Sequence, residues 1–431
     1  MSLVAARFVW LAAAGVLASC SGAGADGDAS SSNAASPATV TGSSEQPAVT
    51  TASAPAPTAP QPAKPRPHST ERTERTTPRS PRPPATATTM LAPNVDPFVC
   101  LQALPTAVVA GQLVWPAVYG DQLDAQASTF AQWQVGGALL MTWPAGATPE
   151  QLAELKTAGE IPLLVATDEE GGDVQRFRRL GVIPSQRQVA ASMSVEDAEQ
   201  MIAEQGLALE AAGVDIVFGP VADVGPADGS DGPMADRVFS ADPTIVADYA
   251  AAYVRGWNRA GILPVLKHFP GHGSASADSH DDTARTPALD ELLRRDLVPY
   301  QRLAGEQVGV MIGHLDVPDL TEDVGVPASL SPAAISNLLL NQLGFAGHLV
   351  VTDALDMEAV ASRVDLPEAA ERAVGAGADV VIYADTSATP SVIARLVDAV
   401  ETGRLAPSRL YGAAQRVLAT KGVDPCALGS T

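Results

Sequence analysis

The chain has 431 residues, with 27 basic and 49 acidic side chains and a formal net charge of −22 at pH 7. Residues 1–94 hold only 7 basic and 5 acidic residues, so the remainder carries 20 against 44, a net charge of −24. This balance excludes nucleic acid as an expected partner, because phosphate backbones are bound by basic surfaces.

The first expected element is a secretory signal over residues 1–20. Arg7 gives it a positive start, and the apolar run over 8–17 is too short to span a bilayer as a helix. It ends in LASC, which resembles the bacterial lipobox, so we expect Cys20 to be lipidated. A plain signal with an unmodified Cys20 is the alternative. A lipid on one residue can hold a protein at a membrane, so the expected location is the outer face of the cell membrane.

Residues 21–94 are low-complexity Ala, Ser, Thr and Pro. Such a stretch buries too little apolar surface to offset its ordering entropy, so it predicts a disordered tether. Its basic part, residues 64–82, is interpreted as a solvated linker, with contact to anionic lipid or wall polymer as the alternative. Residues 95–431 are long enough for one large folded domain.

Three cysteines are present. With Cys20 assigned to lipid, Cys100 and Cys426 remain, one near each end of the folded part. An exported chain meets an oxidising compartment, so this even remainder favours a disulfide between them. Two free thiols are the alternative.

Short apolar runs alternate with helix-patterned stretches in the folded part. We expect strands at residues 108–114, 137–141, 161–167, 214–218, 263–266, 308–312, 348–352 and 379–383. Apolar residues recur every three or four positions in the expected helices at 149–158, 195–212, 243–260, 289–304, 332–343 and 366–376. Eight such units predict an α/β fold, a (β/α)8 TIM barrel, with a doubly wound sheet as the alternative.

Polar residues follow five successive expected strands. They are Asp168 and Glu169, then Asp223, then Lys267 and His268, then His314, and then Asp353. The active site of a TIM barrel lies at the carboxyl ends of its strands, so this common position predicts a site there. Taken singly, Asp353 could be a helix cap, His314 a core histidine and Arg237 part of a surface ion pair.

Residues 267–280, KHFPGHGSASADSH, hold three of the six histidines. His280 is the candidate acid/base, because Asp278 close to it can fix the imidazole tautomer and stabilise the imidazolium. A metal site of His268, His272 and Asp278 is the alternative, but no further ligand stands at a recognisable spacing. Asp353 is the carboxylate that retaining glycoside cleavage needs beside such an acid.

These segments resemble glycoside hydrolase family 3, and most closely its single-domain bacterial β-N-acetylglucosaminidases. KHFPGHG followed by DSH is the most specific match, and TDALDM, DEEGGDVQRF, GVDIVFGPVADV with DRVFS, and RLYGAAQRVLATKG extend it over residues 105–423. The resemblance implies that Asp353 is the nucleophile and that His280, assisted by Asp278, is the acid/base. It implies sugar-binding roles for Asp168, Arg176, Arg237, Lys267 and His268.

Two residues depart from the family pattern. Glu169 stands where Gln is usual, and Asp173 stands where Arg is usual. Both are expected to add negative charge near the entrance and to disfavour anionic peptide stems. The larger β-glucosidases of the family take their acid/base Glu from a second domain. Too little of this sequence follows about residue 425 to build one, so we expect that this absence and the DSH pair indicate the N-acetylglucosaminidase branch.

The implied activity is retaining, exo-acting hydrolysis of terminal β-linked GlcNAc from peptidoglycan fragments such as GlcNAc-β-1,4-MurNAc. We expect a monomer that needs no metal or cofactor. Three alternatives stay open: a phosphorylase that uses the same residues, a β-glucosidase or β-xylosidase, and a lipid-tethered muropeptide-binding protein without turnover.

Overall fold

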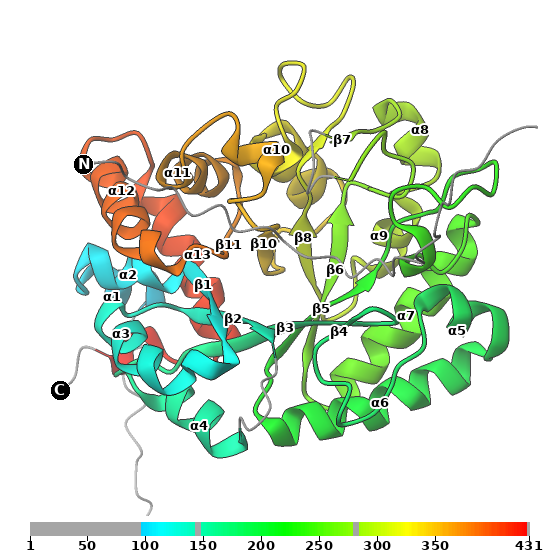
Figure 1. Ribbon diagram of the computed structural model, residues 1–431. Helices are drawn as coiled ribbons and strands as arrows, with labels where there is room; N and C mark the ends of the chain where they lie inside the picture. The colour runs from blue at the N-terminus through cyan, green and yellow to red at the C-terminus, as the bar shows by residue number, and fades with distance from the viewer. Residues whose placement is uncertain (1–95, 143–147, 279–283, 429–431) are drawn as a thin grey trace, which may run out of the picture. The chain divides into compact units, whose positions relative to one another are not determined.

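The computed structural model describes residues 96–142, 148–278 and 284–428. Within them, eight parallel strands form a barrel with helices outside it (Figure 1). In spatial order the strands are β1 (Val114–Tyr119), β2 (Gly137–Thr142), β3 (Leu164–Gly171), β5 (Ile216–Val221), β6 (Leu263–Phe269), β8 (Gly309–Ile312), β10 (Val350–Thr352) and β11 (Val381–Tyr383). The ring closes because β11 pairs with β1 and the Thr352 N–H donates to the Val380 carbonyl at 3.0 Å. The predicted TIM barrel is confirmed.

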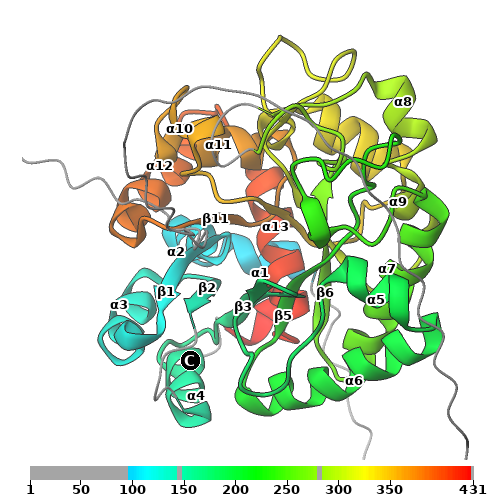
Figure 2. The same cartoon turned by 45° about the vertical axis from the view of Figure 1, so that its right-hand side comes forward.

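Helices cover the outside of the barrel, and α3, α4, α6 and α7 follow one another around it in both views (Figures 1 and 2). The helices are α1 (Pro97–Gln102), α2 (Thr106–Gln112), α3 (Leu123–Trp133), α4 (Pro149–Thr157), α5 (Gln186–Ser192), α6 (Val195–Ala212), α7 (Pro243–Arg259), α8 (Leu289–Arg294), α9 (Val298–Leu303), α10 (Glu358–Ala361), α11 (Leu366–Ala376), α12 (Thr389–Glu401), α13 (Pro407–Thr420) and the π-helix η4 (Ala333–Gln342). Short 3-10 turns are η1 (Gly120–Gln122), η2 (Ala235–Arg237), η3 (Ala328–Leu330), η5 (Thr386–Ala388) and η6 (Pro425–Ala427). The remaining strands are β4 (Val174–Gln175), antiparallel to β3, and the pair β7 (Ala284–Arg285) and β9 (Leu315–Asp316).

The two faces of the barrel strands pack into two separate apolar layers. Alternate strand residues such as Leu164 and Ala166 fill the barrel interior, while Val165 between them packs with the surrounding helices. Side chains alternate along a strand, so every second residue of β3 faces the barrel axis. This alternation decides which polar residues beyond the apolar part of β3 reach the barrel mouth.

Most expected elements are present, and the first expected strand is wrong. Residues 108–114 fall mainly in α2, and the strand begins only at Val114. The apolar run TAVVAGQLV fits a buried helix as well as a strand, so its pattern could not decide between them. The expected helix over 289–304 is divided into α8 and α9, and Pro299 stands in the first turn of α9, where proline is tolerated.

Helices α6 and α11 begin and end where the sequence predicts. Ser194 caps α6 by accepting a hydrogen bond from the Asp197 N–H at 3.1 Å, and Gly213 ends it with φ 98°. Asp365 caps α11 through the Glu368 N–H at 2.9 Å. Side-chain caps and a left-handed glycine are signals in the local sequence, so these helix boundaries could be predicted from it.

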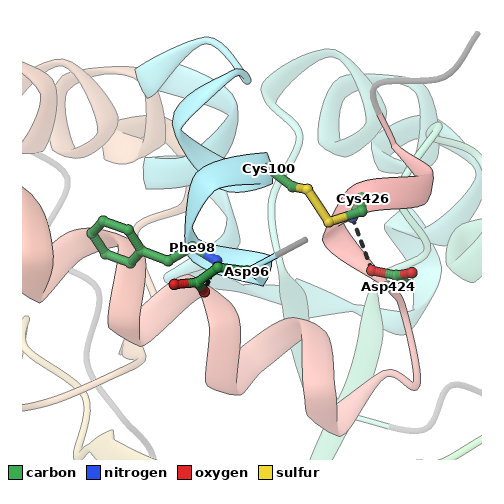
Figure 3. Close-up of a disulfide and its surroundings, with 5 residues drawn as sticks. All are labelled: Asp96, Phe98, Cys100, Asp424 and Cys426. Carbon is green, nitrogen blue, oxygen red and sulfur yellow. Dashed lines mark hydrogen bonds between the residues drawn. A yellow bond between two sulfur atoms is a disulfide. The ribbon is translucent and has the colours of Figure 1, made fainter. Parts of the chain in front are cut away.

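A disulfide joins the two ends of the folded part (Figure 3). Cys100 on α1 is bonded to Cys426 on η6 across a sequence separation of 326, with the Cα atoms 4.9 Å apart. The rings of Phe98 on α1 and Tyr411 on α13 meet edge to face at 5.5 Å. The N-terminal helix is therefore held to the C-terminal segment by a covalent bond and by packing.

The expected signal (residues 1–20), the tether (21–94) and Cys20 lie outside the described residues and stay predictions. In the described ranges no helix combines the length and the apolarity needed to cross a bilayer.

Candidate active site

Strand β3 delivers two carboxylates to the barrel mouth. Asp168 and Glu170 continue the inward-facing series that Leu164 and Ala166 begin. Lys267, at the end of β6, binds both: its Nζ lies 2.7 Å from Asp168 Oδ1 and 2.7 Å from Glu170 Oε1. The side chain of Lys267 is only 3% exposed and that of Asp168 is 19% exposed, so Asp168 is the member that faces an incoming molecule.

Arg237, in the loop after β5, completes this ion network. Its Nε lies 2.9 Å from Glu170 Oε2 and its Nη2 2.8 Å from Glu170 Oε1, a two-pronged contact. Burial opposes the charge of Glu170, but Arg237 and Lys267 outweigh it and hold the pKa of this carboxyl far below its ordinary value. Glu170 is therefore a fixed anion between two cations.

Glu170 was missed as a site residue, and Glu169 was misplaced. Glu169 points away from the mouth, is fully buried, and accepts hydrogen bonds from Gln175 Nε2 at 2.8 Å and from the Arg176 and Phe177 N–H groups at 3.0 Å. Burial raises the pKa of Glu169. The expectation that Glu169 adds charge near the entrance is wrong, because odd and even positions of β3 face opposite sides.

The loop beyond β3 carries Arg176 to the network. Arg176 Nη2 lies 3.5 Å from Asp168 Oδ2, and its buried Nε has no hydrogen-bond partner among the described residues. Asp173 is fully exposed, as expected of an entrance residue, but Arg178 faces it at 3.6 Å. The neighbouring Arg179 is exposed and makes no ion pair with any described residue.

A second buried group lies beside this network. Asp223, after β5, binds His268 twice: its Oδ2 is 2.8 Å from Nδ1 of the ring, and its Oδ1 accepts the His268 N–H at 3.1 Å. Oδ1 also accepts the His272 N–H at 2.7 Å. Burial opposes the charge, yet His268 and His272 lower the pKa of Asp223. An ionised Asp223 fixes the hydrogen of His268 on Nδ1 and turns Nε2 away from it.

The arrangement of the loop histidines does not favour the metal alternative. His268 and His272 stand with ring centroids 5.8 Å apart, edge to face, and Nδ1 of His268 is engaged by Asp223. Across the described ranges no group of three or more His, Cys, Asp or Glu side chains is arranged to hold a metal ion. Asp278 lies close enough to His272 to act on its pKa, whereas His280 lies outside the described residues and stays a prediction.

Asp353 directly follows β10, at the same end of the barrel. Its N–H donates to the Ile312 carbonyl at 2.9 Å, and its Oδ1 accepts the Ala354 N–H at 2.8 Å. It is not a helix cap, because the next helix, α10, begins only at Glu358. The side chain is half-buried, as a carboxylate that must meet a substrate requires.

His314 contacts the backbone of the segment that carries Asp353. It is fully buried, with Nδ1 at 2.7 Å from Ser329 Oγ and Nε2 at 2.8 Å from the Ala354 carbonyl. The interpretation of His314 as a core histidine is confirmed. Its contact fixes the backbone of the residue after Asp353.

A cavity of about 550 Å³ lies at the opposite end of the barrel, where the strands begin. Leu164, Ile216, Leu263 and Leu349 line it together with Lys421, whose pKa burial lowers to about 7. None of the predicted site residues line this cavity, so it is distinct from the site at the mouth.

Four of the five expected sugar-binding residues, Asp168, Arg176, Arg237 and Lys267, therefore share one ion network. His268 is bonded to Asp223 beside this network. Asp223 also influences the pKa of Arg237, together with Glu170 and Asp168. Asp353 stands at the end of β10 in the same barrel mouth. Charged groups of both signs with a half-buried carboxylate suit the recognition and attack of an uncharged polar molecule such as a sugar.

Comparisons with known proteins agree with this arrangement. Residues 108–420 match the model of the glycosyl hydrolase family 3 N-terminal domain. Beta-hexosaminidase LpqI of Mycobacterium tuberculosis is 41% identical over 318 residues, covering 71% of this chain and 80% of that protein. A beta-hexosaminidase of Stenotrophomonas maltophilia is 34% identical over 308 residues, covering 68% and 89%.

Solved structures show the same similarity. A glycosyl hydrolase of the GH3 family from Mycobacterium smegmatis is 38% identical with a TM-score of 0.69, covering 75% of this chain and 98% of that one. A family 3 β-N-acetylglucosaminidase from Paenibacillus is 30% identical with a TM-score of 0.70, covering 76% and 64%. The family model spans nearly all of the barrel, and the chain therefore belongs to glycosyl hydrolase family 3 and is a glycoside hydrolase.

Proposed function

We propose that this chain is a retaining, exo-acting β-N-acetylglucosaminidase that releases terminal GlcNAc from peptidoglycan fragments. The observation that carries the proposal is the half-buried Asp353 in the same barrel mouth as the network of Asp168, Glu170, Lys267 and Arg237. The relatives named beta-hexosaminidase support an N-acetylated amino sugar as the recognised unit.

The network suits a neutral sugar because its charges are already balanced. Glu170 neutralises much of the charge on Lys267 and Arg237, which leaves Asp168 as acceptor and the partly exposed guanidinium of Arg176 as donor toward the substrate. Hydrogen bonds to charged groups are stronger than those between neutral groups, so such a site can hold sugar hydroxyls firmly. His268 Nε2, directed away from Asp223, is a further contact.

In the proposed mechanism Asp353 attacks the anomeric carbon while His280 protonates the leaving glycosidic oxygen. The bond from carbon to the leaving oxygen breaks, and a glycosyl ester to Asp353 forms. His280, now neutral, removes a proton from water, which displaces Asp353 and releases GlcNAc with its configuration retained. Asp278 orients His280. The acetamido group is held and does not act as nucleophile.

The loop between β3 and α5, residues 172–185, has an excess of basic residues that suits a leaving group with a carboxylate. Glu169 contributes no charge at the entrance, and Asp173 is opposed by Arg178, so the exposed Arg179 gives this loop a net positive charge. The lactyl carboxylate of a MurNAc unit is a fitting counterion.

We also propose that the enzyme acts as a monomer anchored by lipid on Cys20 at the outer face of the cell membrane. The 74 residues between Cys20 and Val95, if coil-like, span on the order of 45 Å root-mean-square. That reach would let the barrel act on wall fragments away from the bilayer.

The proposal is tested first with Asp353→Ala, assayed on a 4-nitrophenyl β-N-acetylglucosaminide. Loss of the nucleophile is expected to lower kcat by at least about a thousandfold, because no covalent intermediate can form. Asp290→Ala, which removes an exposed carboxylate from α8, serves as the matched control and should retain full activity. Near-normal turnover by Asp353→Ala would sink the assignment.

Product analysis on GlcNAc-MurNAc, with and without inorganic phosphate, separates the remaining functions. Free GlcNAc under both conditions supports a hydrolase. Formation of GlcNAc-1-phosphate would make the enzyme a phosphorylase, and faster turnover of a glucoside or xyloside would change the sugar. Binding without any product would support the muropeptide-binding alternative.

A further inference from the structure

Asp296, between α8 and α9, lies directly beneath the loop that carries the site histidines. Its side chain is 1% exposed. A Cβ built on Gly271 would stand 2.5 Å from the Asp296 Cβ and 2.8 Å from its Oδ1, so the carboxyl group packs on the bare backbone of Gly271. Gly271 has φ 137°, a conformation that favours glycine. The carboxyl group and the loop are therefore in immediate contact.

Two buried carboxyl groups hold this short segment from different sides. Asp223 accepts hydrogen bonds from the backbone N–H groups of His268 and His272, the residues that flank Gly271 at close range. Asp296 supports Gly271 by contact. The two carboxyl groups differ in their partners: Asp223 has hydrogen-bond donors on both oxygens, whereas Asp296 Oδ1 has no hydrogen-bond partner among the described residues.

The groups around Asp296 favour its neutral form, although Arg295 and the backbone of Asp296 itself act in the opposite direction. Burial and the neighbouring Asp223 raise the pKa of Asp296 to about 7, Glu291 raises it further, and Arg295 only partly opposes them. Arg295 directs its Nη2 to the Gly225 and Ala241 carbonyls, at 2.8 and 3.2 Å.

The other groups that face this region are not counterions either. Burial, Asp223 and Asp296 raise the pKa of Tyr300 well above its ordinary value, so its buried hydroxyl stays neutral. Burial lowers the pKa of His272, against the opposite effect of Asp223. His268 is committed to Asp223. A neutral carboxylic acid is the form of Asp296 that fits these surroundings.

We propose that Asp296 is a positioning residue that, as a neutral acid, supports Gly271 and leaves Asp223 as the single negative charge that orients His268. When Asp296 ionises, two carboxylates oppose each other across Gly271. The loop then shifts from Asp223, and His268 loses its alignment toward the sugar. The consequence is weaker substrate binding, seen mainly in KM. This role rests on the proposed glycosidase activity and does not depend on the identity of the leaving group.

The test compares wild type with Asp296→Asn, which keeps the shape and cannot ionise. On the nitrophenyl N-acetylglucosaminide, in a stopped assay, KM of the wild type is expected to rise about fivefold or more between pH 5.5 and 8.5. KM of Asp296→Asn should stay within about twofold over this range. The change of kcat with pH that reflects titration of the acid/base should be the same in both proteins, because it does not arise from Asp296.

Two further variants separate positioning from general destabilisation. Asp296→Ala removes the support and should raise KM at both pH values, and Asp290→Asn, on the exposed face of α8, should reproduce the wild-type profile.

Urea unfolding supplies a readout that does not need activity. The stability of the wild type relative to Asp296→Asn should fall as pH rises from about 4 to 7, because the raised folded-state pKa of Asp296 is the contribution that only the wild type has. Identical KM profiles for wild type and Asp296→Asn would overturn the proposal, even if GlcNAc is released normally.

Discussion

At the scale of single residues, three consecutive acidic side chains have three different roles. Asp168 faces the mouth, Glu169 anchors the loop behind β3, and Glu170 lies between Lys267 and Arg237. Chemistry alone does not separate them, since all three are carboxylates in one strand. Their roles follow from which face of β3 each occupies and from the hydrogen-bond donors found there.

Glu170→Gln tests the ion network at this scale. Removal of the charge leaves Arg237 without its two-pronged anionic partner and Lys267 with Asp168 alone, so the free energy of unfolding is expected to fall by about 3–5 kcal/mol, with a large loss of kcat/KM. Urea unfolding and steady-state kinetics measure the two effects. Glu154→Gln, on the exposed face of α4, is the control and should change stability by no more than about 0.5 kcal/mol. A wild-type midpoint for Glu170→Gln would mean that the network is not a structural and functional unit.

Sequence reasoning reached much of this site and missed a defined part of it. Asp168, Lys267, His268 and Asp353 were expected at the barrel mouth because each follows an apolar run in the sequence, and strand ends can be predicted from such runs. Glu170 was missed although period-two alternation from Asp168 points to it. The Asp296 contact could not be predicted, because it joins two segments that only the folded barrel brings together.

At the scale of elements, the loop between β3 and α5 holds three arginines within four residues of sequence, Arg176, Arg178 and Arg179. It carries Arg176 inward and presents Arg178 and Arg179 to solvent. In a domain with a strong excess of acidic residues, an arginine without an ion-pair partner in the described part of the chain is a candidate for ligand recognition.

Arg179→Ala is expected to raise KM for GlcNAc-MurNAc about fivefold, because a partly exposed charge pair contributes about 1 kcal/mol. KM for the uncharged nitrophenyl substrate should not change, and added salt should weaken the difference. The matched control is Arg259→Ala, which removes an exposed arginine at the far end of α7. An equal rise of KM on both substrates would argue against recognition of a carboxylate.

The expected elements failed where the pattern was ambiguous and succeeded where local chemistry marked a boundary. Residues 107–111 are all Ala, Val or Gly, so only the barrel's tertiary context makes this run part of α2 rather than a strand. Helix α6 has a serine cap and a terminal glycine, and its limits were therefore predictable.

At the scale of the whole molecule, the chain is tied by a bond between its first and last folded segments. Cys100 and Cys426 were paired from the number of cysteines and the expected export, and they meet because α1 packs on α13 and η6. A covalent link across 326 residues restricts the unfolded chain strongly.

Replacing both cysteines by serine is expected to lower the free energy of unfolding by about 2–5 kcal/mol, measured by urea unfolding without reductant. Activity at 25 °C should persist, because α1 and η6 lie outside the barrel mouth. Reductant should lower the stability of the wild type toward that of the double variant. If reductant and substitution both leave the midpoint unchanged, the bond does not stabilise the fold.

The proposed mechanism requires that Asp353 becomes covalently bonded to the sugar. The most direct measurement is mass spectrometry of the enzyme after reaction with a slow fluorinated N-acetylglucosaminyl substrate that has a good leaving group. We expect one glycosyl unit per chain, located by proteolysis on the peptide that contains Asp353, and none on Asp353→Ala. Turnover of the substrate with no adduct, or an adduct on a different carboxylate, would contradict it.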